Sequence, residues 1–199
     1  MTGRLVYVAG PSGAGKDSLL EWLKEQLRPD APVAFARRTI TRAATKDGEQ
    51  HDSVDMHDFL HLRAADAFGL DWEANGLCYG VRHTELPPRR DGAVVIVNGS
   101  RAYLPEAARR FPDMTVVHVT AGVETLRKRL MARGRESAEI VEARVQRALA
   151  FRMPTGFAFI EIHNDQQPLA RTGAQLAEAL QPAIGPYLRP GLALHGSGK

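Results

Sequence analysis

The sequence predicts an α/β fold in which a mainly parallel sheet is flanked by helices, and three observations support this prediction. Short apolar runs alternate with segments of helical periodicity along the chain. A glycine-rich loop follows the first apolar run and leads into the first helical segment. The 199 residues, of which 44% are hydrophobic and 25% are charged, suit one globular domain that buries a core without disulfides.

Four apolar runs are predicted to form the core strands, because each is short and is bounded by turn or helical signals. The first of these runs covers residues 5–9 and comes directly before the glycine-rich loop. The other three cover residues 93–97, 114–120 and 157–162.

Five segments are predicted to form helices, because apolar residues recur in them at helical spacing. The first runs from Asp17 to about Leu27 and is stopped by Pro29, which cannot continue a helix. The remaining four cover residues 103–111, 123–134, 137–151 and 168–180.

Residues 33–90 differ from the rest of the chain, since they are polar and rich in Arg, His and Asp. We interpret them as an insertion that carries substrate-binding residues between strands of the core. A single domain is expected over residues 1–186. Glycine and proline residues are frequent near the C-terminus, which predicts a flexible tail over residues 187–199.

The composition and charge exclude several classes of protein. No apolar run approaches the roughly 18–20 residues that a membrane helix needs, and residues 1–9 lack the pattern of a signal peptide. Cys78 is the only cysteine, which excludes an internal disulfide and favours the cytoplasm. The net charge is only +3, and the paired arginines at 89–90 and 109–110 have no interleaved aromatic residues. We therefore expect neither a membrane nor a nucleic acid as partner, and the sequence leaves a homodimer open.

A phosphate-binding loop is predicted directly after the first strand. Residues 10–16 read G-P-S-G-A-G-K, which is the pattern G-x-x-x-x-G-K between a strand and a helix. Its glycines let backbone N–H groups converge on phosphate oxygens, and the positive end of the following helix points at them. Lys16 would reach the β- and γ-phosphates of ATP. The predicted ATP-binding residues are Gly10, Pro11, Ser12, Gly13, Ala14, Gly15, Lys16, Asp17 and Ser18.

The magnesium site departs from the usual pattern of this loop. The residue after Lys16 is Asp17 rather than Ser or Thr, and the strand ends lack a clear metal-holding Asp. A carboxylate in the first turn of a helix is favoured by the helix dipole and is a good hard-oxygen ligand. We predict that Asp17 holds Mg²⁺, with Ser18 as the alternative ligand.

Several motifs resemble those of the guanylate kinase family and occur in the same order, over about residues 5–180. The phosphate loop is the first of them. The family segment T-T-R…G-E, which contacts the phosphate of the acceptor nucleotide, resembles residues 39–42 followed by Gly48-Glu49. The stretch E-W…Y-Y-G resembles residues 71–72 and 78–80, and the I-x-N-D near the adenine site resembles residues 162–165.

The lid of the family also has a counterpart, since its pattern K-R-L-x-x-R-G…R is similar to residues 128–134 followed by Arg144. The resemblance implies a P-loop kinase with an inserted acceptor-binding subdomain and a helical lid over about residues 130–148. It also implies that ATP and Mg²⁺ are the cofactors. By the same resemblance the catalytic residues are Lys16, Arg133 and Arg144.

The acceptor site does not follow guanylate kinase. The base-contacting Tyr of that family falls at or near His51, and the acidic residue that reads guanine at a strand end is missing, since residues 98–101 are N-G-S-R. Arg37 and Arg38 stand where the family has small polar residues. These changes remove purine recognition and add guanidinium groups. Such groups bind phosphate through two parallel hydrogen bonds, which suits a second phosphate on the acceptor.

This departure resembles the branch of these kinases that phosphorylates ribose 1,5-bisphosphate to 5-phosphoribosyl 1-diphosphate in phosphonate degradation. The resemblance implies a phosphotransferase whose partner is a small phosphorylated sugar. The predicted acceptor-binding residues are Arg37, Arg38, Arg42, Tyr79, Asn98, Ser100 and Arg101. Two alternatives remain, a guanylate kinase with an aberrant base site and a non-catalytic guanylate-kinase-like binding module. The intact Gly15-Lys16 and both lid arginines argue against the binding module.

Overall fold

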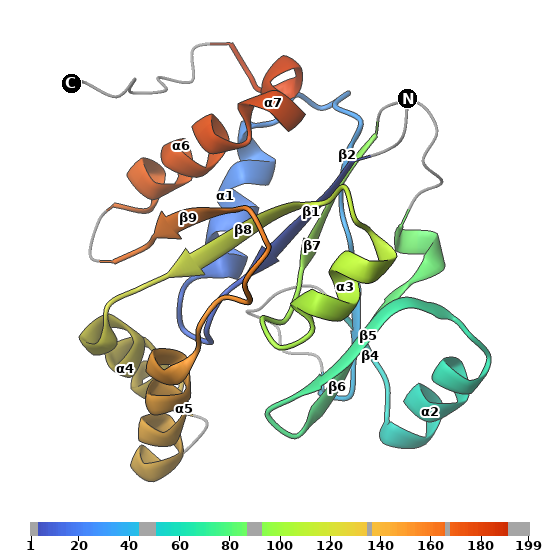
Figure 1. Ribbon diagram of the computed structural model, residues 1–199, viewed down its shortest axis with the longest axis vertical. Coiled ribbons are helices and arrows are strands. Elements are labelled where there is room, and N and C mark those ends of the chain that lie inside the picture. Colours follow the sequence, from blue (N-terminus) through green and yellow to red (C-terminus); the bar gives the residue numbers. More distant parts are fainter. Residues whose placement is uncertain (1–3, 44–50, 87–92, 135–136, 166–167, 191–199) are drawn as a thin grey trace. The chain divides into compact units, whose positions relative to one another are not determined.

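In a computed structural model of the chain, the described residues are 4–43, 51–86, 93–134, 137–165 and 168–190. Strands and helices alternate in them as an α/β fold requires (Figure 1). The strands are β1 (Arg4–Ala9), β2 (Val33–Phe35), β3 (Arg38–Ile40), β4 (His51–Ser53), β5 (Phe68–Ala74), β6 (Leu77–Arg82), β7 (Val94–Asn98), β8 (Thr115–Thr120) and β9 (Phe159–His163). The helices are α1 (Lys16–Gln26), α2 (Met56–Ala64), α3 (Leu104–Arg110), α4 (Val123–Ala132), α5 (Ala138–Ala150), α6 (Leu169–Ala179) and α7 (Gln181–Ile184), with short 3₁₀ helices η1 (His83–Glu85) and η2 (Gly185–Tyr187).

The described strands form two sheets. The larger has five strands in the order β2-β7-β1-β8-β9, in which β2 pairs with β7 and β8 pairs with β9 in parallel. The smaller has four strands in the order β4-β3-β6-β5, antiparallel except for the β3–β4 pair. The predicted α/β fold with a parallel core sheet is therefore confirmed, as are the four predicted core strands and the five predicted helices within one or two residues at each end.

Strand β2 belongs to the core sheet although the sequence places it inside the polar segment 33–90. It has three residues, too few to show a period of apolar side chains. Backbone hydrogen bonds hold it in place, because the Val94 N–H donates to the Pro32 carbonyl and the Ala36 N–H donates to the Ile96 carbonyl, each at 2.9 Å. The core sheet therefore has a fifth strand that only its pairing reveals.

The chain divides into two compact units, each of which has its own helices and strand pairs. The first unit contains residues 1–6 and 32–114, with the four-stranded sheet, α2 and α3. The second contains residues 7–31 and 115–199, with α1, the β8–β9 pair and α4 to α7. A single kinase domain over residues 1–186 stays a prediction.

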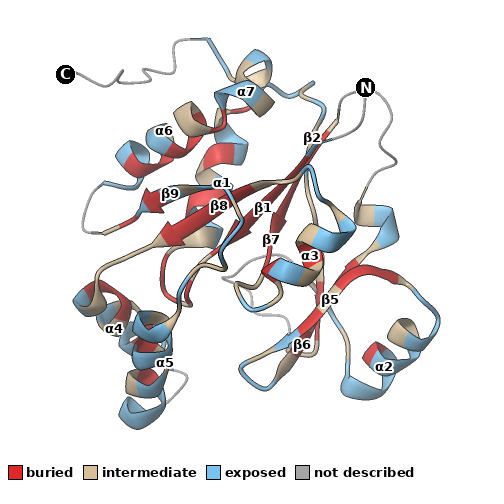
Figure 2. Cartoon of the chain, in the orientation of Figure 1, coloured by how far each residue is buried: buried red, intermediate tan, exposed pale blue. Residues whose placement is uncertain are grey.

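Burial in the second unit is concentrated on β8 and on one face of α1 and of α6 (Figure 2). Helix α6 packs against α1, and a Cβ at Gly173 would lie only 2.3 Å from the ring of Trp22. Since real Cβ atoms do not approach other atoms so closely, the glycine lets these two helices come into contact. Leu19, Leu23 and Leu176 are fully buried, which anchors α1 directly behind the glycine-rich loop.

A small hydrophobic cluster lies between α2 and the four-stranded sheet of the first unit. Phe59 of α2 stacks on Phe68 of β5 with ring centroids 4.8 Å apart, and Cys78 is buried beside them. This single cysteine is buried, and its burial raises the pKa of its thiol. Cys78 therefore acts as a small hydrophobic residue.

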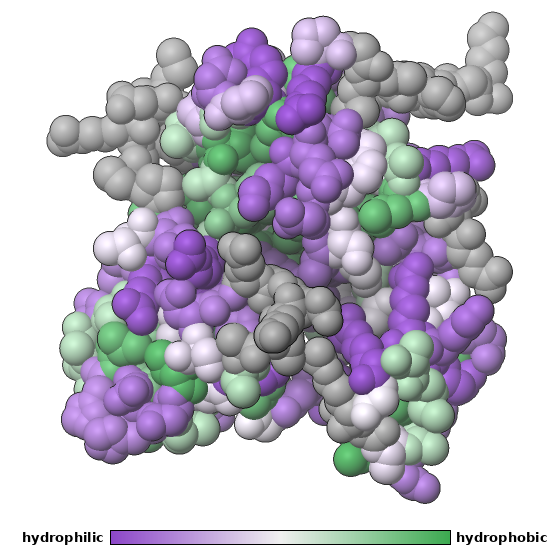
Figure 3. All heavy atoms as spheres, turned by 180° about the vertical axis from the view of Figure 1, so that it is seen from behind, coloured by the Kyte–Doolittle hydropathy of each residue, from purple (hydrophilic) through white to green (hydrophobic). Residues whose placement is uncertain are grey.

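The surface gives no sign of a membrane-spanning segment among the residues described. None of the helices there is both long enough and apolar enough to cross a bilayer. Hydrophilic residues cover most of the face shown in Figure 3, and apolar residues gather in smaller groups on it.

The segment expected to begin the tail is hydrogen-bonded to the end of α1. The Arg28 N–H donates to the Tyr187 carbonyl at 2.9 Å, and the Arg189 N–H donates to the Gln26 carbonyl at 2.8 Å. Arg189 also donates from Nε to the Leu27 carbonyl at 3.0 Å. Arg189 thus satisfies two carbonyl groups that a helix end leaves without partners, and Tyr187 accepts from the N–H group of Arg28. Residues 191–199 of the expected tail lie outside the described part of the chain.

Candidate functional site

The glycine-rich loop connects β1 to α1, which is the context that the phosphate-loop pattern requires. Gly13 and Gly15 have φ angles of 88° and 82°, in the left-handed region that glycine adopts without strain. A Cβ at Gly10 would lie 2.1 Å from the carbonyl oxygen of Val119, so a larger residue cannot be placed there without moving backbone. The conformation of the loop backbone therefore depends on glycine at these three positions.

The start of α1 is suited to receive an anion. Gly15 is the N-cap and has no side chain to cap the first turn, whose N–H groups attract negative charge. Lys16 donates from Nζ to the carbonyls of Gly10 and Pro11, at 2.9 and 3.1 Å, which holds its ammonium group over the loop. Glycines, helix N-terminus and ammonium thus occur together, as phosphate binding requires.

The predicted magnesium ligands lie in the same first turn of α1. Asp17 and Ser18 are both exposed, and Asp17 is the acidic residue of that turn. An exposed carboxylate next to a phosphate-binding loop supplies the hard oxygen ligands that Mg²⁺ prefers. The residues present therefore fit a magnesium ion, which Asp17 would hold.

Asn164, which directly follows β9, supports the loop from outside and was not among the predicted site residues. Its buried side chain donates from Nδ2 to the carbonyl of Ala14 at 2.7 Å. Its backbone N–H donates to the carbonyl of Thr120, at the end of β8. A Cβ at Gly15 would lie 2.3 Å from the Asn164 amide nitrogen, so the Asn164 side chain can occupy its position only because residue 15 is glycine. Asn164 therefore ties the loop to the ends of β8 and β9.

Arg129 on α4 provides a second support for the loop. Its Nη1 donates to the carbonyls of Gly13 and Asn164 at 3.3 and 3.0 Å, and its Nη2 donates to the carbonyl of Asp165 at 3.0 Å. A guanidinium group has donors only, and three carbonyl oxygens give it acceptors without a carboxylate. Arg129 and Gly13 are 116 residues apart, so only membership of the lid pattern could have drawn attention to it from the sequence.

The predicted lid consists of the end of α4, the connection to α5, and most of α5, and the two helices pack against each other (Figure 1). Arg127 of α4 joins them through an ion pair from Nε to Glu142 Oε2 at 2.9 Å. Hydrogen bonds to Glu142 and Glu124 raise the pKa of Arg127. Two residues along α5, Arg144 donates from Nη2 to the Ser12 hydroxyl of the phosphate loop at 2.7 Å. One of the two predicted lid arginines therefore lies at the loop.

Arg133, the other predicted lid arginine, lies at the C-terminal end of α4 and is exposed. Its backbone N–H donates to the Leu130 carbonyl at 3.2 Å. Within the described ranges, its side chain forms no hydrogen bond or ion pair. The structure thus brings Lys16, Ser12 and Arg144 together and leaves Arg133 at the surface.

The predicted acceptor-binding residues all belong to the first unit, and Arg38 is central among them. The Arg38 guanidinium lies over the ring of Tyr79, 5.4 Å from its centroid, and its Nη1 donates to the carbonyl of Asn98 at 3.3 Å. Arg38, Tyr79 and Asn98 come from three strands, β3, β6 and β7. The structure therefore brings together three residues that the sequence only suggested as one group.

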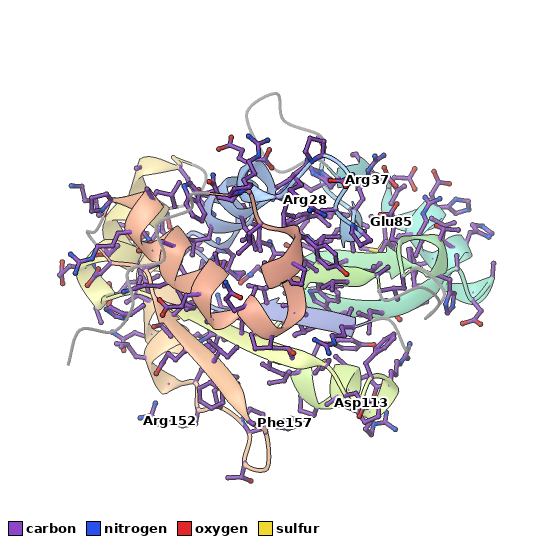
Figure 4. The ribbon with its side chains drawn as sticks, turned by 90° about the horizontal axis from the view of Figure 1, so that it is seen from above. Arg28, Arg37, Glu85, Asp113, Arg152 and Phe157 are labelled. Atoms are coloured by element: carbon purple, nitrogen blue, oxygen red, sulfur yellow. The ribbon has the colours of Figure 1, made fainter. Side chains whose placement is uncertain are left out.

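Arg37 lies elsewhere, although it precedes Arg38 directly. Its guanidinium pairs with the Asp52 carboxylate at 3.4 Å, and its backbone N–H donates to Glu85 Oε2 at 2.9 Å. Figure 4 labels Arg37 and Glu85, which lie close to each other. Since the Arg37 side chain is more than half exposed, its ion pair with Asp52 contributes little to stability.

Arg42 and Arg101 are cations with unusual surroundings. The Arg42 Nε is buried and has no hydrogen-bond partner among the residues that the structure describes. Burial lowers the pKa of Arg101 to about 10, so its guanidinium is still charged at neutral pH. A charge that has lost part of its hydration is stabilised by an opposite charge or an acceptor. Arg42 would therefore gain from an anion, and Arg101 offers a charge that is partly shielded from water. Ser100, next to Arg101, is partly buried and Asn98 is buried.

His51, at the position expected to contact a base in guanylate kinases, instead contacts the backbone. Its Nε2 lies 3.2 Å from the carbonyl oxygen of Arg42, and the Ser53 hydroxyl donates to the same oxygen at 2.7 Å. These two contacts hold the backbone of Arg42 in place. Gly48-Glu49, the end of the segment that resembles T-T-R…G-E, lies outside the described residues.

No protein-family model matches the chain. The chain is 40% identical to the ribose 1,5-bisphosphate phosphokinase PhnN of Thiobacillus denitrificans, over 91% of this chain and 94% of the relative. It is 48% identical to the protein of the same name from Pseudomonas paraeruginosa, over 76% of this chain and 81% of the relative. A third relative of that name, from Janthinobacterium sp., is 40% identical over 92% of this chain, which spans only 40% of the relative's length.

A solved structure supports the fold. The guanylate kinase from Anaplasma phagocytophilum matches with a TM-score of 0.66 over 91% of this chain and 86% of its own. The two sequences are only 16% identical, so this likeness concerns the fold and not the substrate. It confirms the predicted guanylate-kinase-like P-loop fold.

Proposed function

The chain belongs to the family of ribose 1,5-bisphosphate phosphokinases, and we propose that it transfers the γ-phosphoryl group of ATP to the 1-phosphate of ribose 1,5-bisphosphate. An oxygen of the acceptor's 1-phosphate forms the new bond to the γ-phosphorus. The bond from that phosphorus to the β,γ-bridging oxygen breaks, and ADP leaves. The product is 5-phosphoribosyl 1-diphosphate. Such a transfer needs little covalent chemistry from the protein, and depends on positioning and on charge stabilisation.

The observation that carries this proposal is the set of arginines in the first unit. Arg38 is held between Tyr79 and Asn98, Arg42 has a buried donor without a partner among the described residues, and Arg101 is partly desolvated. Each phosphate of a bisphosphate carries about −1.5 to −2 charges near neutral pH. Several arginines that each donate two hydrogen bonds would therefore bind such an acceptor more tightly. The contact of His51 with the Arg42 backbone supports the same reading, because a guanine ring would need another partner.

The second unit carries the groups suited to the donor. We propose that the loop from Gly10 to Lys16 binds the phosphates of ATP through its backbone N–H groups and the Lys16 ammonium. Arg144, which already reaches Ser12, would stabilise the charge that develops on the transferred group. Arg133 is proposed to act with it from the exposed end of α4.

Magnesium would be held at the first turn of α1. We propose that Asp17 is its protein ligand, directly or through water, because its exposed carboxylate lies beside the loop. When bound, the ion would neutralise part of the phosphate charge. The proposed setting is the cytoplasm, where ATP and a reduced Cys78 are expected, and a homodimer stays a prediction.

A phosphoryl-transfer assay over a small acceptor panel tests the function. With ATP, ribose 1,5-bisphosphate should be converted at least about a hundredfold more efficiently than GMP, which is about 2.7 kcal/mol at the transition state. Ribose 5-phosphate is the matched control, because it lacks the 1-phosphate that accepts the group. Comparable turnover of GMP would show a guanylate kinase. No turnover of any acceptor, with ATP still bound, would show a non-catalytic binding module.

A further inference from the structure

A column of three aromatic rings ends on Arg38 in the first unit. Trp72 stacks on Tyr79 with ring centroids 5.6 Å apart and ring planes only 3° from parallel. Trp72 also contacts the ring of Tyr103, with centroids 5.7 Å apart and ring planes tilted by 32°. The Arg38 guanidinium lies on the far end, over the ring of Tyr79. The four side chains come from β5, β6, β3 and the residue before α3.

Strand pairing explains why these side chains share one face of the four-stranded sheet. In the antiparallel pair of β5 and β6, Trp72 lies opposite Tyr79. In the pair of β3 and β6, Ile40 lies opposite the same Tyr79. Since side chains alternate along a strand, Arg38 projects from the same face as Ile40. The stack of rings is therefore a consequence of register, and a slip by one residue would remove it.

Burial decreases along the column from Trp72 towards Arg38. Trp72 is only 6% exposed, whereas Tyr79 and Arg38 are partly exposed. Tyr103, which is partly exposed, is held beside Trp72, because its hydroxyl oxygen accepts a hydrogen bond from the Asp71 N–H at 3.5 Å. Burial raises the pKa of this hydroxyl. The tryptophan is thus buried and in contact with two tyrosine rings, and it supports the ring of Tyr79.

Such a column can fix the plane of a guanidinium. An Arg side chain on an aromatic face is held by cation–π attraction, worth about 0.5–1 kcal/mol where exposed and about 2 kcal/mol where desolvated. The hydrogen bond from Arg38 to the Asn98 carbonyl fixes the rotation about that contact. An arginine that is already oriented loses less conformational entropy when a phosphate binds to it. Bidentate binding requires the plane of the guanidinium to face the phosphate correctly.

We propose that Trp72 is a positioning residue for the acceptor: it supports the Tyr79 ring, which in turn orients Arg38 toward an acceptor phosphate. The identity of the acceptor in this statement rests on the proposed function. Trp72 itself is buried, so the proposal gives it no contact of its own with the substrate. The Trp72 side chain should therefore act on acceptor binding only through Arg38, and ATP binding should not depend on it.

A double-mutant cycle between Trp72 and Arg38 tests this dependence. Trp72→Leu keeps a buried apolar residue and removes the ring, and it should raise the KM for ribose 1,5-bisphosphate by about tenfold. The KM for ATP should stay within about twofold. Trp72→Phe keeps a smaller ring and should raise the acceptor KM by only about threefold. In an Arg38→Met background, both Trp72 variants should change the acceptor KM by less than about twofold.

Equal effects of Trp72→Leu in both backgrounds would overturn the proposal, since Trp72 would then act on stability or on another residue. An unchanged acceptor KM in a folded Trp72→Leu protein would do the same. If Trp72→Leu does not fold, Trp72→Phe decides the question by the same cycle. If the wild-type chain converts GMP and not ribose 1,5-bisphosphate, the proposed function fails, and the cycle is measured with GMP. If the cycle with GMP shows no coupling between Trp72 and Arg38, the proposed role of Trp72 is overturned as well.

Discussion

The guanidinium of Arg144 donates a hydrogen bond to the hydroxyl of Ser12 at 2.7 Å and so joins α5 to the phosphate loop across 132 residues of sequence. The two residues belong to segments that resemble different motifs, the lid and the loop. Their contact places a positive charge next to the backbone groups that would bind the phosphates of ATP. It also connects the lid helices to the donor side of the proposed reaction, because α5 packs on α4.

Arg144→Ala should lower kcat by about 10³-fold, as for other arginines that stabilise the charge of a transferring phosphoryl group. The KM for ATP should change much less. Arg147→Ala on the same helix is the matched control, because Arg147 is exposed and its Nε bonds only to the Ala143 carbonyl. Steady-state kinetics of both variants check this. A kcat for Arg144→Ala as high as that of the Arg147 control would exclude a role in the transfer.

Arg133→Ala should also lower kcat by about 10³-fold, although its side chain has no partner among the described residues. An exposed arginine without such contacts contributes little to folding, so the melting temperature should stay within about 2 °C of the parent. Thermal unfolding and single-turnover kinetics together separate the two effects. If the variant keeps its rate within a few-fold, Arg133 is a surface residue only.

Arg129→Met should destabilise the protein and weaken ATP binding together. It removes a charged donor from the carbonyls of Gly13, Asn164 and Asp165, and each such hydrogen bond is worth about 1.5–3 kcal/mol. Three such bonds amount to at least about 4.5 kcal/mol, so we expect the melting temperature to fall by about 9 °C or more. The ATP KM should rise by about tenfold, with the acceptor KM unchanged. Lys128→Met, next in sequence and exposed, is the control. An unchanged ATP KM would show that Arg129 serves stability alone.

Asp17→Asn should raise the Mg²⁺ concentration for half-maximal rate by about tenfold, which corresponds to roughly 1.4 kcal/mol. The amide keeps the size of the side chain and most of its capping ability, and removes the charge that attracts the ion. A magnesium titration of the rate at fixed ATP is the measurement. Should the titration be unchanged while Ser18→Ala is strongly impaired, the metal ligand is Ser18.

Shortening the chain should be tolerated down to residue 190 and not further. A chain that ends at Pro190 keeps the hydrogen bonds of Tyr187 and Arg189 to the end of α1, whereas a chain that ends at Gly185 loses them. At about 1 kcal/mol for each net hydrogen bond, the second truncation should cost about 3 kcal/mol. Melting temperatures should then differ by roughly 6–12 °C. Equal values would show that residues 187–189 add no stability.

The sequence by itself was sufficient to predict the fold class, the core strands and the phosphate loop. These are encoded in short segments, because a strand, a glycine-rich turn and a helix start each depend on a few neighbouring residues. The departure from a guanine site also follows from residue identities, at His51 and at residues 98–101. The kinase family follows from the same motifs, and the relatives confirm it.

Contacts between distant segments were decided only by the tertiary structure. Arg129 with Gly13, Asn164 with Ala14, and the rings behind Arg38 join residues that no local pattern connects. Strand β2 was missed because three residues are too few to show a periodic pattern of apolar side chains. Its pairing with β7 is made by backbone groups, which every residue carries. Arg37 and Arg38 are the clearest case. They are identical in type and adjacent in sequence, but successive residues of an extended chain point to opposite sides, so one faces Asp52 and the other faces Tyr79.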